Sequence, residues 1–236
     1  MKRGVLVFAV SAFAAFTGAV WPGVSSAAPP VVVELYTAQG CVACAKAAAH
    51  MGDLADEKGV LPLTFSVDYW DYLGWKDTFA KPEFADRQRA YDKRFDVAEP
   101  FTPQVVVDGR TQIAAKPEKI DDLVHAARRT PIDSPQMRWR GEDYVAVGSG
   151  RLPRGGAGVW LVRYDPKPQE VEVREGDNRG HKVTERNVVV ELVRLGAWRG
   201  RPVLLKAPAA SEDGLKSVVL VQADNGGRIL GVLAQP

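Results

Sequence analysis

The sequence predicts an α/β half of β-α-β-α-β-β-α order, residues 29–130, followed by an all-β, sandwich-like half, residues 136–236. In the first half, strand-like runs alternate with segments of helical periodicity, and the first run is continuously apolar, as a buried parallel strand is. In the second half the helical periodicity ends, and short β-rich runs are separated by glycine and proline. Residues 131–135 between the halves have the composition of a linker.

The first 28 residues have the features of a secretory signal peptide. Lys2 and Arg3 form a basic start, residues 5–20 are apolar, and small residues suit a cleavage after Ala28. The apolar run is shorter than the roughly 18 residues of a membrane-spanning helix, and no later run is long and apolar enough. We therefore expect a secreted or periplasmic chain without stable membrane insertion.

The charge balance argues against nucleic acid and anionic membranes as partners. The whole chain carries 31 basic and 29 acidic side chains, and removal of the leader takes away Lys2 and Arg3 but no acidic residue. A net charge near zero provides no electrostatic attraction to phosphate-rich surfaces.

The first crossover unit is expected to place two parallel strands side by side. Residues 31–36 are a β-rich run, 37–40 a turn, and the alanine-rich segment from Cys41 has helical periodicity. A second β-run, 61–67, follows, and a right-handed crossover makes both strands end at the same edge of the sheet. The aromatic segment 68–77 comes after the second strand, so we expect it beside the cysteines.

The remaining elements of this half are a helix, a hairpin and a closing helix. Pro82 suits the first turn of a helix over residues 82–95, because the first helical position needs no amide donor. Asp108-Gly109 is a strong signal for a type I′ turn between the strand-like runs on either side of it. Pro117 begins the last segment of helical periodicity.

Cys41 and Cys44 are the only cysteines of the chain, and they admit three interpretations. A structural staple is poorly supported, because so small a ring stabilises by only roughly 2 kcal/mol in the chain-entropy account. A closed zinc site needs four ligands, and the three histidines are scattered. The remaining interpretation is redox chemistry, with Cys41 at a helix N-terminus as the attacking thiolate and Cys44 as the resolving thiol. We predict no metal and no cofactor.

A CxxC motif at a strand-to-helix turn, a Thr-Pro pair before the third strand, a hairpin and a final helix together resemble the thioredoxin fold. The resemblance implies that Pro103 follows a cis peptide bond and faces the disulfide, and that the backbone around Thr102 pairs with an extended substrate. The whole chain is also similar to a family of secreted bacterial proteins of unknown function, through the segments VVVELYTAQGCVAC, VDYWDYLGWKD, RQRAYDKRF, TPQVVVDGR and GDNRGHKVTERNVV.

Glu34 is the one charged residue of the first strand, seven positions before Cys41. Proteins of the thioredoxin fold carry a buried acid on the equivalent strand, beneath the resolving cysteine. The resemblance therefore implies that Glu34 relays the proton of Cys44. The alternative is that Glu34 pairs with an arginine at the surface of the sheet.

The aromatic segment has two interpretations. Trp70, Tyr72 and Trp75 could form a rim that binds an extended partner next to the disulfide. They could equally form a small core that packs the loop onto the second half, and for at least one tryptophan we prefer packing.

One polar segment of the second half, GDNRGHKVTERN, also has two interpretations. Its side chains could contact a ligand, the other half or a partner, or they could form a hydrogen-bonded loop that joins two strands. We prefer the loop. The residues concerned are Asn178, Arg179, His181 and Asn187.

Two functions are compatible with these observations. The first is an exported thiol–disulfide oxidoreductase that exchanges its disulfide with protein or small-molecule thiols. The second is a non-catalytic binding or envelope-assembly module in which the disulfide is a small clamp. An accessible Cys41 thiol would indicate the enzyme, whereas two buried sulfurs would indicate the clamp. A metallochaperone is a weaker third possibility.

Overall fold

The computed structural model describes residues 28–130 and 132–235, so the predicted leader lies outside the described residues except for Ala28. The first half has the predicted order of elements, with one additional 3₁₀ turn, η1. The elements of the first half are β1 (Val31–Thr37), α1 (Cys44–Ala55), β2 (Val60–Ser66), η1 (Asp71–Leu73), α2 (Pro82–Phe95), β3 (Gln104–Val107), β4 (Thr111–Ala114) and α3 (Pro117–Arg128).

The second half is built from strands alone in the residues that the structure describes. They are β5 (Met137–Arg140), β6 (Tyr144–Val147), β7 (Ala157–Asp165), β8 (Gln169–Glu172), β9 (Lys182–Glu185), β10 (Val188–Trp198), β11 (Val203–Lys206), β12 (Lys216–Ala223) and β13 (Ile229–Ala234). The Asp108-Gly109 and Asn225-Gly226 pairs have positive φ at both positions, as type I′ hairpin turns require.

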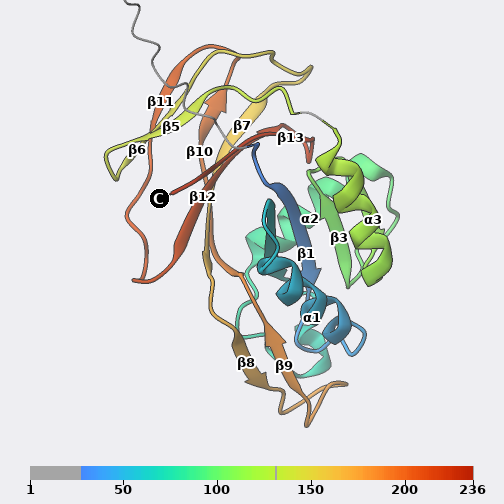
Figure 1. The fold of residues 1–236 in the computed structure, drawn as a ribbon. Helices are drawn as coiled ribbons and strands as arrows, with labels where there is room; N and C mark the ends of the chain where they lie inside the picture. The colour runs from blue at the N-terminus through green and yellow to red at the C-terminus, as the bar shows by residue number, and fades with distance from the viewer. Residues whose placement is uncertain (1–27, 131, 236) are drawn as a thin grey trace, which may run out of the picture.

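The centre of the molecule is one eight-stranded sheet to which both halves contribute (Figure 1). Its strand order is β13-β12-β7-β10-β2-β1-β3-β4, and β1 runs parallel to β2 and antiparallel to β3. The halves meet where β10 pairs with β2, with Val188 opposite Thr64. Next to this pair the Thr64 amide donates to the Asn187 carbonyl at 3.0 Å.

The prediction of a separate sandwich for residues 136–236 is therefore wrong in one respect. A smaller sheet, β11-β6-β5, does pack over part of the second half, around a core that includes Val145, Leu161 and Trp198. The other layer, however, continues into the sheet of the first half. The edge of β2 would otherwise be left with unpaired backbone groups, and local sequence patterns do not reveal which distant strand will cover such an edge. The boundary at residues 131–135 stays a prediction.

The two faces of the sheet carry different cores. Val31, Val33 and Leu35 of β1 pack with α1 and α3. The alternate residues Val32 and Tyr36 face the other side, where they join α2 and side chains of β7 and β12 in one cluster. Because this cluster contains residues of both halves, the halves share a core as well as a sheet.

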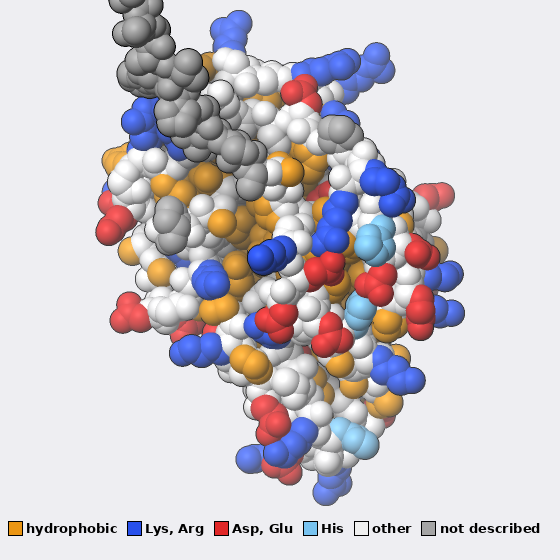
Figure 2. Space-filling view, in the orientation of Figure 1, with side chains coloured by type: hydrophobic (Ala, Val, Ile, Leu, Met, Phe, Trp, Pro, Cys, Tyr) orange, Lys and Arg blue, Asp and Glu red, His pale blue; other side chains and the backbone are white. Residues whose placement is uncertain are grey.

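The hairpin β8-β9 extends beside α1 at one end of the molecule, and β9 packs against that helix (Figure 1). The second half thus reaches back over the part of the first half that carries the cysteines. Figure 2 shows acidic and basic side chains interspersed over one face, without a large area of a single sign.

Candidate functional site

The two cysteines form a disulfide in the turn between β1 and α1, with their Cα atoms 5.4 Å apart. Both are buried, with 3% of Cys41 and 2% of Cys44 exposed. Between them Val42 is 61% exposed, so a hydrophobic side chain points outward from the turn. The prediction that the helix begins at Cys41 is wrong by three residues. Helix α1 begins at Cys44, whose amide donates to the Cys41 carbonyl in the turn that precedes the helix.

Gln39 is the residue that attaches the surrounding loops to this turn. It is fully buried. Its backbone amide donates to Asp77 Oδ2 at 2.6 Å, and its side-chain carbonyl accepts from Trp75 Nε1 at 2.9 Å. From the second half, Asn178 Nδ2 donates to the backbone carbonyl of Gln39 at 2.9 Å. The aromatic segment and the 176–180 loop are therefore both anchored two residues before Cys41.

The aromatic segment is divided between packing and exposure. Trp70 packs against the core cluster that contains Cys41, and Trp75 is held by its hydrogen bond to Gln39. Tyr72, in contrast, is 82% exposed. Both tryptophans are half-buried in these contacts, and Tyr72 is the most exposed of the three side chains.

Thr102 and Pro103 lie at the same end of the sheet as the disulfide. They are joined by a cis peptide bond, as the resemblance implied. Strand β3 begins directly after them, and Gln104 pairs with Tyr36 near the end of β1. The Pro103 carbonyl accepts from the Ala115 amide at 3.0 Å. The Thr102 hydroxyl is buried and has no hydrogen-bond partner among the described residues.

Glu34 is fully buried on the face of β1 that packs against α2. Its Oε1 lies 2.6 Å from Arg87 Nε, and its Oε2 accepts from the Tyr91 hydroxyl. Burial raises the pKa of Tyr91 well above its usual value, which keeps this hydroxyl protonated as a donor. The arginine pair that was the alternative to proton relay is thus observed, although inside the protein rather than at the sheet surface. No hydrogen bond of the described residues joins Glu34 to Cys44.

A second carboxyl group, Glu185 of β9, is buried near the ends of β1 and β2. It is 1% exposed, and neither carboxylate oxygen has a hydrogen-bond partner among the described residues. Burial, with a smaller contribution from the nearby Asp77 carboxylate, raises the pKa of Glu185 to about 8, and the neighbouring Ser66 hydroxyl opposes this rise. Glu185 therefore holds its proton at neutral pH. It belongs to the second half of the chain, although its neighbours Ser66 and Asp77 belong to the first.

Two hydroxyl groups accompany Glu185. Thr37 and Ser66 are paired across β1 and β2, and both hydroxyls are buried without a partner among the described residues. Burial also raises the pKa of Asp77, against the effect of the Gln39 and Phe79 amides that donate to it. Unpartnered buried polar groups are uncommon in proteins, so their concentration at the ends of β1 and β2, where β1 leads into the disulfide turn, marks a candidate functional site.

Comparison with known proteins identifies the family of the chain but assigns no biochemical activity to it. Residues 32–222 match a family described as a protein of unknown function, DUF1223. This protein belongs to the DUF1223 family. The predicted similarity to a family of unknown function is confirmed to that extent. No curated protein matches the chain.

Two solved structures are similar to this DUF1223 protein. One is the crystal structure of a protein from Agrobacterium tumefaciens, which is 27% identical with a TM-score of 0.70 and is matched over 89% of this chain and 95% of its own. The other is HBP35 of Porphyromonas gingivalis, 12% identical with a TM-score of 0.56, matched over 89% of this chain and 76% of its own. At that identity the second shows a shared fold alone.

In this DUF1223 protein the polar segment GDNRGHKVTERN docks the second half onto the first. Asn178 donates to Gln39, and Asn187 Nδ2 donates to the Pro62 carbonyl at 2.8 Å. Arg186 forms an ion pair with Asp56 at the end of α1. Asn178 and Asn187 therefore contact the other half, which is the interpretation that we did not prefer, instead of only joining two strands of their own half.

Sequence reasoning missed Gln39, Arg87 and Glu185. For Glu185 a signal was present, because β9 alternates exposed Lys182 and Thr184 with buried Val183 and Glu185. An acid at an inward position of such a strand is a candidate for function. No group of three or more His, Cys, Asp or Glu side chains that could hold a metal occurs among the described residues.

Proposed function

We propose that this protein exchanges the Cys41–Cys44 disulfide with thiols of proteins or small molecules. The observation that supports this most directly is the placement of the CxxC disulfide in the turn between a central parallel strand and a helix, at the sheet end where Thr102-Pro103 also lies. This arrangement resembles the thioredoxin fold, in which the same turn carries the reactive pair.

The exchange requires two displacement steps. A partner thiolate attacks the Cys41 sulfur, the bond between Cys41 and Cys44 breaks, and Cys44 leaves as a thiolate that takes up a proton. A second partner thiolate then attacks the partner sulfur of the mixed disulfide, and Cys41 leaves. The partner dithiol is oxidised by two electrons, the protein disulfide is reduced, and the two thiol protons pass from partner to protein. The reverse sequence oxidises the protein.

We infer that Glu185, rather than Glu34, exchanges the proton of Cys44. Both oxygens of Glu34 are occupied by Arg87 and Tyr91, whereas both oxygens of Glu185 are free of hydrogen bonds among the described residues. The pKa of Glu185, about 8, is close to the roughly 8.5 of a free cysteine thiol. Groups of such similar pKa exchange a proton in either direction with little driving force when they are hydrogen-bonded directly or through one water.

A second candidate function is supported by the burial of both cysteines. With 3% and 2% of these residues exposed, a partner thiol reaches the disulfide only after the covering loops move. A non-catalytic binding module that keeps the disulfide as a clamp needs no such movement. The two candidates differ in the reduction potential of the pair.

The test is an equilibration of the chain without its predicted leader, residues 29–236, in glutathione buffers, with the thiol fraction counted by alkylation and mass spectrometry. A potential inside the range of about −270 to −120 mV supports exchange, and one below about −300 mV supports the clamp. In an exchange protein the Cys44→Ser variant accumulates mixed disulfides at Cys41. The matched Cys41→Ser variant should trap far fewer partners, because its remaining thiol, Cys44, lies within helix α1 and not in the turn that precedes the helix.

A further inference from the structure

In the small sheet β11-β6-β5, the side chains of β5 alternate between half-buried and exposed positions, and the exposed ones are arginines. In the segment Met137-Arg138-Trp139-Arg140, the first and third side chains pack into the core beneath the sheet. Because successive side chains of a strand point to opposite faces, Arg138 and Arg140 lie on the other side. Both are exposed.

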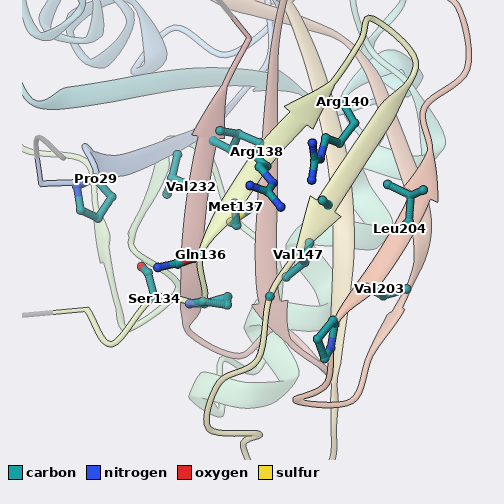
Figure 3. A pocket seen from close by; sticks show the side chains of 15 residues that line it. Pro29, Ser134, Gln136, Met137, Arg138, Arg140, Val147, Val203, Leu204 and Val232 are labelled. Carbon is teal, nitrogen blue, oxygen red and sulfur yellow. The ribbon is translucent and has the colours of Figure 1, made fainter. Parts of the chain in front are cut away.

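A pocket of about 1200 Å³ lies over this face and the neighbouring strands (Figure 3). Its apolar part comes from β5, β6, β11 and β13, and Leu204 within it is 59% exposed. Val203, Val232 and Leu233 of the same lining are half-buried. A large pocket with a predominantly hydrophobic lining and a few polar groups is typical of a site for a small organic ligand.

The charge of the pocket is of one sign. Among the described residues that line it, Arg138 and Arg140 are the only charged ones, and Figure 3 shows both side chains over the same part of the pocket. Neither forms an ion pair with any described residue. The acids Glu142 and Asp143 lie in the following turn and do not line the pocket. The two arginines leave the same face of the strand from Cα atoms about 7 Å apart, so their positive charges lie on one side of the sheet, where an anion could pair with both.

We propose that this pocket binds an anionic amphiphile of the fatty-acid class. The carboxylate accepts hydrogen bonds from the Arg138 and Arg140 guanidinium groups, a pairing that suits arginine because its donors match both carboxylate oxygens. The alkyl chain covers the apolar side chains that the structure leaves in contact with water, including Leu204. Neither cysteine lines this pocket, so the outcome is independent of the proposed disulfide exchange.

The probe is decanoate, kept below its micelle concentration and titrated into residues 29–236 by calorimetry. We expect saturable binding to one site, with an affinity that rises by up to about fourfold for each methylene added between octanoate and dodecanoate. Acetate supplies the charge without the chain and should not bind measurably. Decanol supplies the chain without the charge and should bind at least tenfold more weakly.

The double variant Arg138→Gln/Arg140→Gln should weaken decanoate binding at least tenfold, and Leu204→Glu should abolish it. The matched control is Arg154→Gln, which alters an exposed arginine outside the pocket lining and should bind as the unaltered protein does. All of these positions are exposed, so circular dichroism should be unchanged.

Equal binding of decanoate and decanol, or equal binding by the double variant, would overturn the proposal. So would arginine-dependent binding to phosphatidylglycerol vesicles without binding of monomeric decanoate, which would identify a membrane surface as the partner.

Discussion

Glu34 and Arg87 form an ion pair inside the protein, with Arg87 Nε 2.6 Å from Glu34 Oε1 and both side chains at most 5% exposed. They come from β1 and α2, and Tyr91 of α2 donates to the second carboxylate oxygen. Gln222 of β12 in turn donates to the Tyr91 hydroxyl at 2.8 Å. One buried network therefore links the first half of the chain to the second.

Removing the arginine of this network should be strongly destabilising. Arg87→Met leaves the Glu34 carboxylate buried without its cation, and we expect a loss of about 3–5 kcal/mol in the free energy of unfolding, measured with urea. The double variant Glu34→Gln/Arg87→Met should lose less than Arg87→Met alone, because no unpaired charge remains. The control Arg89→Met breaks an exposed pair with Asp86 on the same helix and should change stability by less than about 1 kcal/mol. A loss of that small size for Arg87→Met would contradict the argument.

Glu185 should make the protein less stable as the pH rises. Its pKa is about 8 in the folded protein and 4.5 in the reference state, so the folded state binds the proton more tightly. The stabilisation is fully present below pH 4.5, declines as the pH rises through the folded pKa of about 8, and is then lost. The total change from this one group is about 5 kcal/mol. Urea unfolding at intervals between pH 4.5 and 9 measures it.

Glu185→Gln is the control for that titration. The amide is nearly the same size and stays neutral, so the decline between pH 4.5 and 8 should be smaller by the contribution of Glu185. An identical pH profile for the variant and the unaltered protein would show that the group titrating in this range is another one.

Most elements of the first half could be predicted because their signals are local. Pro82 begins α2, Pro117 begins α3, and Asp108-Gly109 forms the predicted turn. Each of these residues acts through its own backbone geometry, which the sequence displays directly.

The features that could not be predicted depend on contacts between distant parts of the chain. The pairing of Val188 with Thr64 joins strands 124 positions apart, and no pattern around either residue specifies the other. The same holds for the site, because Glu185 reaches Ser66 and Asp77 of the first half only through the packing of β9 against α1. Glu34 could be singled out from the sequence as the one charge of its strand, but its partner Arg87 is 53 positions away.

The hydrogen bond from Asn178 to the Gln39 carbonyl should control access to the disulfide. Asn178→Ala leaves this buried carbonyl unpaired and loosens the 176–180 loop, at a cost of about 1 kcal/mol. If reduction proceeds through local opening, the rate of reduction by dithiothreitol should rise about fivefold, as measured by thiol labelling. Asp177→Ala, an exposed neighbour on the same loop, should leave the rate unchanged. A rate that is the same in Asn178→Ala would mean that other segments limit access.

Asn187 should be the most sensitive position at the junction of the two halves. Its φ is 52°, a left-handed conformation that costs alanine about 1–2 kcal/mol, and its side chain donates to the Pro62 carbonyl at 2.8 Å. Asn187→Ala should lose both contributions, about 2–3 kcal/mol in total, whereas Asn187→Gly should lose only the hydrogen bond, about 1 kcal/mol. Asn225 has a similar φ of 57° in an exposed turn, so Asn225→Ala isolates the conformational cost. Urea unfolding of the three variants should therefore rank Asn187→Ala as the least stable. Equal losses in Asn187→Ala and Asn225→Ala would show that the Pro62 hydrogen bond does not help to hold β10 against β2.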